Sequence, residues 1–202
     1  MNTHIPEIEK KPISEIIEFQ EQALSSFLHY LNEHSKFYKE LFKQHTIDIA
    51  SIKSLKDLQQ IPTTDKEDLQ LRSKDFCCVG PEKIIDYITT SGTLGNPVTF
   101  ALSENDLQRL AYNESISLAC TGGNEHEIYQ LMTTLDRRFM AGLAYFMGAR
   151  KLGAGCVRVG SGIPELQWDT IFRIAPTAII TVPSFILKLL DYADQHKIEY
   201  KN

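Results

Sequence analysis

The chain has 202 residues and a formal net charge of −5, and 43% of its residues are apolar. This composition excludes a chain that is disordered throughout, and the length suffices for one domain with a sizeable core or for one domain and an extra segment. The excess of acidic over basic side chains argues against a nucleic-acid partner, which selects a basic surface. No run of eighteen apolar residues is present, so we expect no membrane span and no membrane partner.

The N-terminal residues lack the apolar core of a signal peptide and the arginine-rich character of a transit peptide, so we expect a cytoplasmic protein. The four cysteines form no Cys-x-x-Cys pair. The segment Glu125-His126-Glu127 matches no zinc spacing. These patterns predict reduced thiols and no metal held by cysteine or histidine.

Composition divides the chain near residue 80. All 11 glycines lie at or after Gly80, and residues 1–75 alone hold 23 charged side chains. We therefore expect an N-terminal helical segment over residues 1–80 and an α/β subdomain over residues 81–202.

Capping signals and apolar periodicity predict three helices before residue 80. Ser14 is the expected N-cap of the first helix, whose apolar stripe runs from residue 17 to residue 31. A second, short helix is expected around residues 37–42. Thr64 and Glu67 have the spacing of a capping box that opens a third helix through about Leu71.

After residue 80, short apolar runs alternate with amphipathic stretches. The expected strands are residues 84–90, 98–102, 128–132, 156–159 and 178–182. The expected helices are residues 104–120, about 139–153, 164–173 and one that Ser184 caps. Such alternation predicts an α/β fold with a doubly wound, largely parallel sheet and helices on both faces. In such sheets, ligands bind at the carboxyl ends of the strands.

Residues 89–97, Thr-Thr-Ser-Gly-Thr-Leu-Gly-Asn-Pro, lie between two predicted strands. Glycine lets backbone N–H groups approach an anion closely, and serine and threonine hydroxyls add donors. The Gly-Lys-Ser/Thr ending of a Walker A loop is missing. The same residue types are typical of tight turns, so a phosphate-binding loop and a hairpin turn with solvated hydroxyls are both consistent with this segment.

The segment resembles the phosphate loop of the adenylate-forming superfamily, and other segments resemble the phenylacetate-CoA ligase branch of it. In chain order these are residues 34–42, 58–66, 139–143, 148–154 and 181–185. The family loop ends in Gly-Lys-Pro, whereas Asn96 stands here in place of the lysine and Leu94 in place of a threonine. No counterpart of the family's aromatic-Gly-x-Thr-Glu segment is present. The resemblance thus implies the N-terminal part of an acyl-CoA synthetase-like large domain, an incomplete portion of the full family domain.

The resemblance implies that a carboxylic acid attacks ATP to give an acyl-adenylate, which coenzyme A then converts to a thioester, with Mg²⁺ assisting the first step. It assigns phosphate binding to Thr90, Ser91, Gly92, Thr93, Gly95 and Asn96. It also places Phe139 and Gly162 at the acyl pocket, where an aromatic side chain suits an aromatic acid. Alternatively, Phe139 packs in the core and Gly162 forms a tight turn. No catalytic residue is assigned, and a homodimer is implied.

Three functions are consistent with these features. The first is an AMP-forming acyl- or aryl-CoA ligase, and the second is an acyl-protein synthetase that transfers the acyl group to a protein thiol. The third is a non-catalytic module that binds a nucleotide or an acyl ligand. Arg137-Arg138 offers cations for an acyl or coenzyme A phosphate group, although a solvated charged turn is the alternative.

Overall fold

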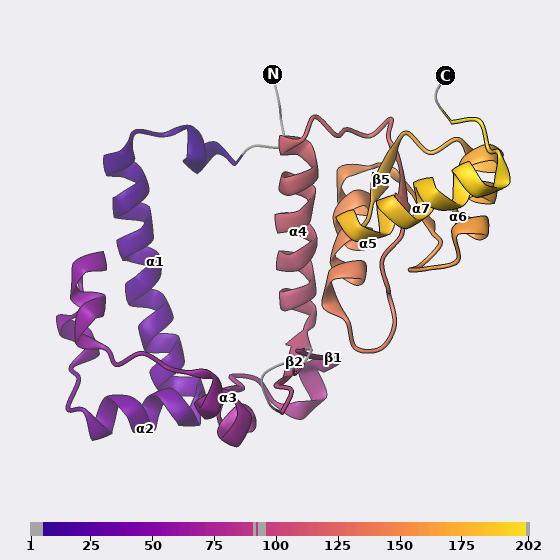
Figure 1. Ribbon diagram of the computed structural model, residues 1–202. Coiled ribbons are helices and arrows are strands. Elements are labelled where there is room, and N and C mark those ends of the chain that lie inside the picture. Colours follow the sequence, from indigo (N-terminus) through magenta and orange to yellow (C-terminus); the bar gives the residue numbers. More distant parts are fainter. Residues whose placement is uncertain (1–5, 91, 93–95, 201–202) are drawn as a thin grey trace. The chain divides into compact units, whose positions relative to one another are not determined.

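A computed structural model describes residues 6–90, 92 and 96–200 of the chain (Figure 1). The chain divides into two compact units after Glu104. Residues 81–104, which composition groups with the α/β part, thus lie in the first unit. The domain boundary expected at residue 80 stays a prediction.

Three α-helices form most of the first unit: α1 (Ile13–His34), α2 (Lys36–Gln44) and α3 (Lys66–Arg72). The prediction of Ser14 as an N-cap is wrong, because α1 begins at Ile13 directly after Pro12. Pro12 is itself the N-cap, with a φ of −55° and a ψ of 147°, and it makes no side-chain cap hydrogen bond.

The capping box at the start of α3 lies one residue later than the sequence predicts. The Asp68 backbone N–H donates to Asp65 Oδ1 at 2.9 Å, and the Asp65 N–H donates to Asp68 Oδ2 at 3.1 Å. Thr64 and Glu67 therefore do not form the box. Two aspartates replace the usual hydroxyl and glutamate, and their carboxylates also favour the positive end of the helix dipole.

Within the described residues, five short 3-10 helices, which the sequence did not predict, precede or connect the longer elements. They are η1 (Glu7–Lys10), η2 (Ile49–Ser51), η3 (Leu55–Gln60), η4 (Ser73–Phe76) and η5 (Pro81–Lys83). The core of the first unit contains the buried side chains of Leu28, Leu31, Phe42 and Ile52.

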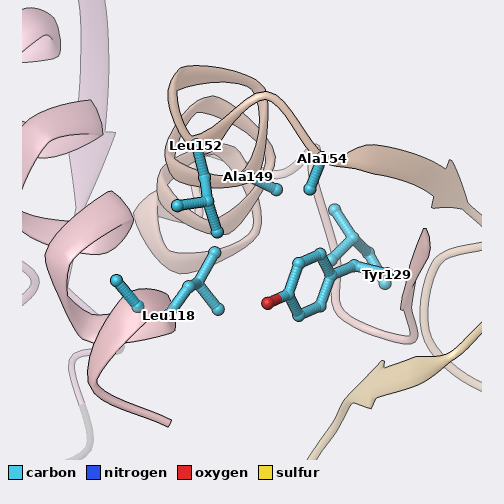
Figure 2. Close-up of a cluster of buried hydrophobic side chains, with 7 residues drawn as sticks. Leu118, Tyr129, Ala149, Leu152 and Ala154 are labelled. Carbon is cyan, nitrogen blue, oxygen red and sulfur yellow. The ribbon is translucent and has the colours of Figure 1, made fainter. Parts of the chain in front are cut away.

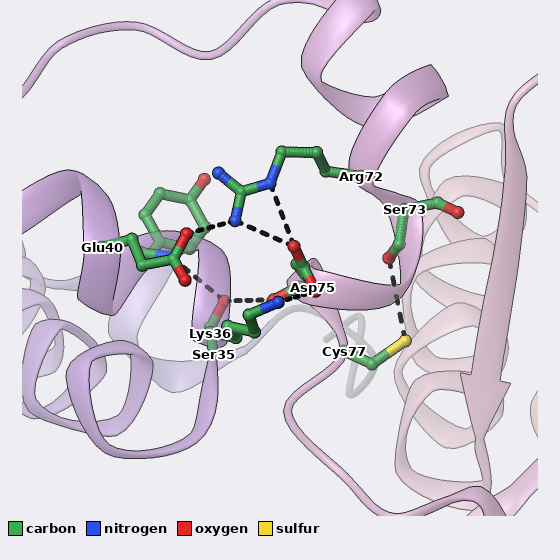
Figure 3. Close-up of polar contacts among 8 residues, drawn as sticks. Ser35, Lys36, Glu40, Arg72, Ser73, Asp75 and Cys77 are labelled. Carbon is green, nitrogen blue, oxygen red and sulfur yellow. Dashed lines mark hydrogen bonds and ion pairs between the residues drawn. The ribbon is translucent and has the colours of Figure 1, made fainter.

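A cluster of charged side chains joins α2, α3 and η4 (Figure 3). The Asp75 carboxylate accepts hydrogen bonds from Arg72 Nε at 3.0 Å and Nη2 at 2.8 Å, and from Lys36 Nζ at 3.2 Å. Arg72 Nη2 also donates to Glu40 Oε2 at 2.5 Å. The hydrogen bonds from Arg72, and next those from Lys36, hold the pKa of Asp75 below its usual value.

We expect Asp75→Asn to lower the urea midpoint of the chain at neutral pH, because the amide cannot replace the charge that Arg72 and Lys36 face. A carboxyl whose pKa is lowered by folding stabilises the fold above its unfolded pKa and loses that contribution as pH falls through the folded pKa. The difference between wild type and variant should therefore disappear in acid. Circular dichroism at a series of pH values measures it, and the exposed Asp191→Asn is the control. A difference that is the same at every pH would contradict this assignment.

Strands β1 (Ile84–Thr89) and β2 (Thr99–Ser103) form an antiparallel hairpin in the first unit. Both strands lie within about one residue of their predicted positions. Thr89 pairs with Thr99, so the predicted phosphate loop connects the two strands at the end of the hairpin. The hairpin is a sheet of its own and does not join the parallel sheet of the second unit.

The second unit contains three parallel strands in the order β4-β3-β5. These are β3 (Ile128–Leu131), β4 (Gly155–Arg158) and β5 (Ala178–Ile180), and the helices are α4 (Glu104–Cys120), α5 (Met140–Leu152), α6 (Pro164–Ile174) and α7 (Pro183–His196). The prediction of Ser184 as the cap of the last helix is wrong. Val182 is the N-cap and Pro183 is the first helical residue, so Ser184 already lies inside α7.

Side chains of β3 alternate between the two faces of this sheet. Tyr129 and Leu131 are buried against α4 and α5, in the cluster that Figure 2 shows converging from these elements. Gln130 and Met132 point to the other face, where Gln130 meets α6 and Met132 packs in a cluster with α6 and α7. The predicted parallel sheet with helices on both faces is thereby confirmed.

Two glycines end α4 at the place that the sequence predicts. The Gly123 N–H donates to the Leu118 carbonyl at 3.0 Å, and the Gly122 N–H donates to the Ala119 carbonyl at 3.0 Å. Gly122 has a φ of 91°, which side-chain-bearing residues rarely adopt. These features define a Schellman motif. Within residues 6–90, 92 and 96–200, no helix is long and apolar enough to cross a membrane.

Candidate phosphate loop and substrate cleft

Three of the six predicted phosphate-binding residues lie in the described part of the chain. Thr90 closes the loop, because its N–H donates to the Val98 carbonyl at 3.0 Å and its hydroxyl accepts from the Val98 N–H at 2.9 Å. The Thr90 hydroxyl proton is used in neither of these two bonds. Gly92 has a φ of 67°, which favours glycine at this position.

Asn96 is exposed, and its backbone carbonyl accepts a hydrogen bond from Gln70 Nε2 of α3. Its side chain, which the resemblance aligns with a lysine of the family loop, brings no charge to the loop. Ser91, Thr93 and Gly95 lie outside the described residues. Phosphate binding by these six residues stays a prediction.

A cleft of about 410 Å³ opens in the second unit at the carboxyl ends of β3 and β4. Its lining residues are Thr134, Leu135, Asp136 and Arg137 after β3, and Arg158, Val159, Gly160 and Ser161 at the end of β4. This is the edge at which open parallel sheets bind their ligands. The sequence predicted the edge but not these residues as a group, because it does not say which strands are neighbours.

A hydrogen bond between two hydroxyls connects the two walls of the cleft. Thr134 Oγ1 and Ser161 Oγ lie 3.0 Å apart, although they are 27 residues apart in the chain. Two further threonines follow strands of the same sheet, Thr133 after β3 and Thr181 after β5. Within the described part of the chain, the buried hydroxyls of both threonines have no hydrogen-bond partner. This edge of the sheet therefore carries hydroxyl groups whose hydrogen bonds are not all satisfied by the protein.

The two residues predicted for the acyl pocket lie next to the lining residues but are not among them. Phe139 is the N-cap of α5 and is 49% exposed, so it does not pack in the core of its unit. Its N–H donates to the carbonyl of Asp136 at 3.2 Å. Gly162 follows Ser161 and has a φ of 78°, as a tight turn requires. Their role in acyl binding stays a prediction.

A buried pair of glutamines holds the turn that forms one wall of the cleft. Gln167 Nε2 donates to the carbonyls of Gly160 at 2.9 Å and Gly162 at 3.0 Å. Gln130 Nε2 in turn donates to Gln167 Oε1 at 2.8 Å. Both side chains are fully buried. Sequence reasoning missed this clamp, whose only signal was a glutamine in the middle of an apolar strand.

The charged groups of the cleft are two arginines and one aspartate. Arg137 Nε lies 3.9 Å from Asp136 Oδ2. Arg158 lies over the ring of Phe146, with its guanidinium carbon 5.1 Å from the ring centroid, and Arg150 lies over the same ring at 5.6 Å. The cation predicted at residue 137 is thus at the cleft, and Arg158 is an additional one.

The Cys156 thiol lies in β4, two residues before Arg158. Burial raises its pKa, although the positive charges of Arg150 and Arg158 act in the opposite direction. A thiol that stays protonated at neutral pH is a poor nucleophile. Nothing in this environment therefore activates Cys156 for covalent chemistry.

Solved structures share this fold. A crystal structure of 2-hydroxyisobutyryl-CoA ligase with 2-HIB-AMP and CoA in the thioesterification state matches with a TM-score of 0.84 and 22% sequence identity, covering 98% of this chain and 45% of that one. An open conformation of the same ligase matches with a TM-score of 0.83 and covers 92% of this chain and 42% of that one. The chain therefore shares the fold of this part of those two structures.

Sequence relatives narrow this class. The chain is 30% identical over 191 residues to phenylacetate-coenzyme A ligase of Thermus thermophilus. The aligned region covers 92% of this chain and 42% of the relative. It is 28% identical over 191 residues to phenylacetate-coenzyme A ligase of Escherichia coli, covering 94% and 44%. No protein-family model matches. The resemblance to the phenylacetate-CoA ligase branch is confirmed, and the chain spans less than half the length of these curated relatives.

Proposed function

We propose that this chain is the N-terminal portion of an AMP-forming acyl-CoA ligase, which activates a small carboxylic acid with ATP and passes the acyl group to coenzyme A. The observation that carries the proposal is the similarity to phenylacetate-coenzyme A ligases along more than nine-tenths of the chain. The cleft at the carboxyl edge of the parallel sheet supports it, because that edge is where such sheets bind substrates.

In this proposal the hairpin loop would hold the phosphates of ATP, and Mg²⁺ would supply positive charge that offsets theirs. Hydroxyl and backbone N–H donors stabilise the charge that develops on the leaving pyrophosphate. The Gly92 backbone and the Thr90 hydroxyl proton are suited to this task. The cleft of the second unit holds the acid, and the half-exposed Phe139 beside it suits an aromatic one. A homodimer follows from the resemblance alone and stays a prediction.

Exchange of labelled pyrophosphate into ATP, driven by a panel of small carboxylic acids, tests the adenylation step in the full-length ligase of which this chain would be the N-terminal portion. We expect exchange that depends on the acid, and a decrease of about tenfold or more in Ser91→Ala, because a hydrogen bond to a charged group is lost. Ser51→Ala, in the 3-10 helix η2, is the matched control and should leave the exchange unchanged.

A second candidate is a non-catalytic module that binds a nucleotide or acyl ligand. Asn96 favours it, because the loop lacks the cation that the family places there. Saturable binding of an acyl-adenylate without exchange for any acid would favour this module over the ligase. The absence of both binding and exchange would overturn both functions.

A further inference from the structure

Positive charge exceeds negative charge in the cleft. Its charged lining residues are Arg137, Arg158 and Asp136. The contact between Arg137 and Asp136, at 3.9 Å, is at the outer limit of an ion pair. Among the described residues, no carboxylate lies within ion-pair distance of Arg158, whose guanidinium contacts the Phe146 ring instead. The guanidinium of Arg158 therefore remains available to an anionic group of a ligand.

The position of Arg158 is defined by its surroundings. It is the last residue of β4, and its guanidinium lies over an aromatic ring, 5.1 Å from the centroid. A guanidinium that is stacked in this way loses less side-chain entropy when it forms hydrogen bonds. Arg150 stacks on the same ring but does not line the cleft, so it offers a comparison within the same chain.

Neutral donors lie in the same cleft. In the pair formed by Thr134 and Ser161, one hydroxyl donates to the other, and the second hydroxyl proton is left for a ligand. A guanidinium and a hydroxyl together match the oxygens of a carboxylate. The other lining side chains include the apolar Leu135 and Val159, and a volume of about 410 Å³ accommodates a small molecule.

We propose that this cleft binds a second anionic group on the acid substrate, a carboxylate opposite the one that is activated, with Arg158 as the main determinant and Arg137 as its partner. The substrate is then a small aromatic dicarboxylic acid. The inference rests on the proposed function, in which this cleft is the acid site.

Calorimetric titration of the chain with phenylacetate and with 4-carboxyphenylacetate tests this proposal, because the two acids differ only in the second carboxylate. We expect the diacid to bind about five- to tenfold more tightly, as a partly exposed ion pair with hydrogen bonds allows. Arg158→Met should reduce the preference to less than twofold by weakening the binding of the diacid. Arg150→Met, the matched control, should retain the preference.

Equal affinity for the two acids, a preference that survives Arg158→Met, or no binding of either acid would overturn the inference. Titration with inorganic phosphate and with coenzyme A tests whether the cleft binds a phosphate group instead of a carboxylate. If either displaces the diacid and depends on Arg158 in the same way at lower concentration, the cleft is a phosphate site and the inference is also wrong. Pyrophosphate exchange driven by phenylacetate, without a diacid preference, would support the ligase function and contradict the diacid inference. A diacid preference without exchange would support the diacid site and contradict the ligase function.

Discussion

Replacing Gln167 by leucine is expected to destabilise the second unit by about 4 kcal/mol, because each buried polar group left without a partner costs roughly 1–3 kcal/mol. The side chain now satisfies the carbonyls of Gly160 and Gly162 and accepts from Gln130 Nε2. Leucine has a similar volume but neither donor nor acceptor. The variant therefore removes the partner of the Gly160 and Gly162 carbonyls and of one Gln130 Nε2 hydrogen, and Gly160 lines the cleft.

Urea unfolding followed by tryptophan fluorescence measures this effect. Trp168 is the single tryptophan, lies directly after Gln167 and is buried, so it reports the unfolding of the second unit. Gln195→Leu, which changes an exposed glutamine of α7 in the same unit, is the matched control and should shift stability by less than about 0.5 kcal/mol. A loss of less than about 1 kcal/mol in Gln167→Leu would show that the clamp does not stabilise this turn.

Gly142→Ala is expected to destabilise the same unit by about 2 kcal/mol. A Cβ atom at Gly142 would overlap the carbonyl oxygen of Thr134 and lie 2.7 Å from its carbonyl carbon and 3.1 Å from the Leu135 nitrogen. These are backbone atoms, which cannot rotate away as a flexible side chain can. Overpacking of this kind costs roughly 1–3 kcal/mol and outweighs the gain of up to about 1 kcal/mol from placing alanine in a helix.

The overlap also involves the cleft, because Thr134 and Leu135 line it. Gly142→Ala should therefore weaken binding of the diacid as well as stability. Gly155→Ala is the matched control, since a Cβ atom there would meet its nearest neighbour at an ordinary distance of 3.5 Å. If both variants unfold at the same urea concentration as the wild type, the close approach of α5 to the loop after β3 does not require glycine at position 142.

The sequence by itself determined the local elements of this protein. Period-two and helical apolar patterns predicted the parallel strands and the helices to within a few residues, because each pattern reflects which face of an element is buried. Helix starts were less predictable. Ser14, Thr64 and Ser184 have the chemistry of caps, but Pro12, Asp65 and Val182 occupy the cap positions, because several neighbouring residues can satisfy the first turn of a helix.

Only the tertiary structure decided which strand ends meet. The order β4-β3-β5 brings Thr134 next to Ser161 and places Arg158 in the same cleft as Arg137. These pairs are far apart in the chain, and no periodicity encodes which parallel strands are neighbours. The Gln130–Gln167 clamp arises in the same way, since a buried amide is stable only when folding brings its partner to it. The local patterns thus specify strands and helices, whereas the chemistry of the cleft depends on contacts between distant segments.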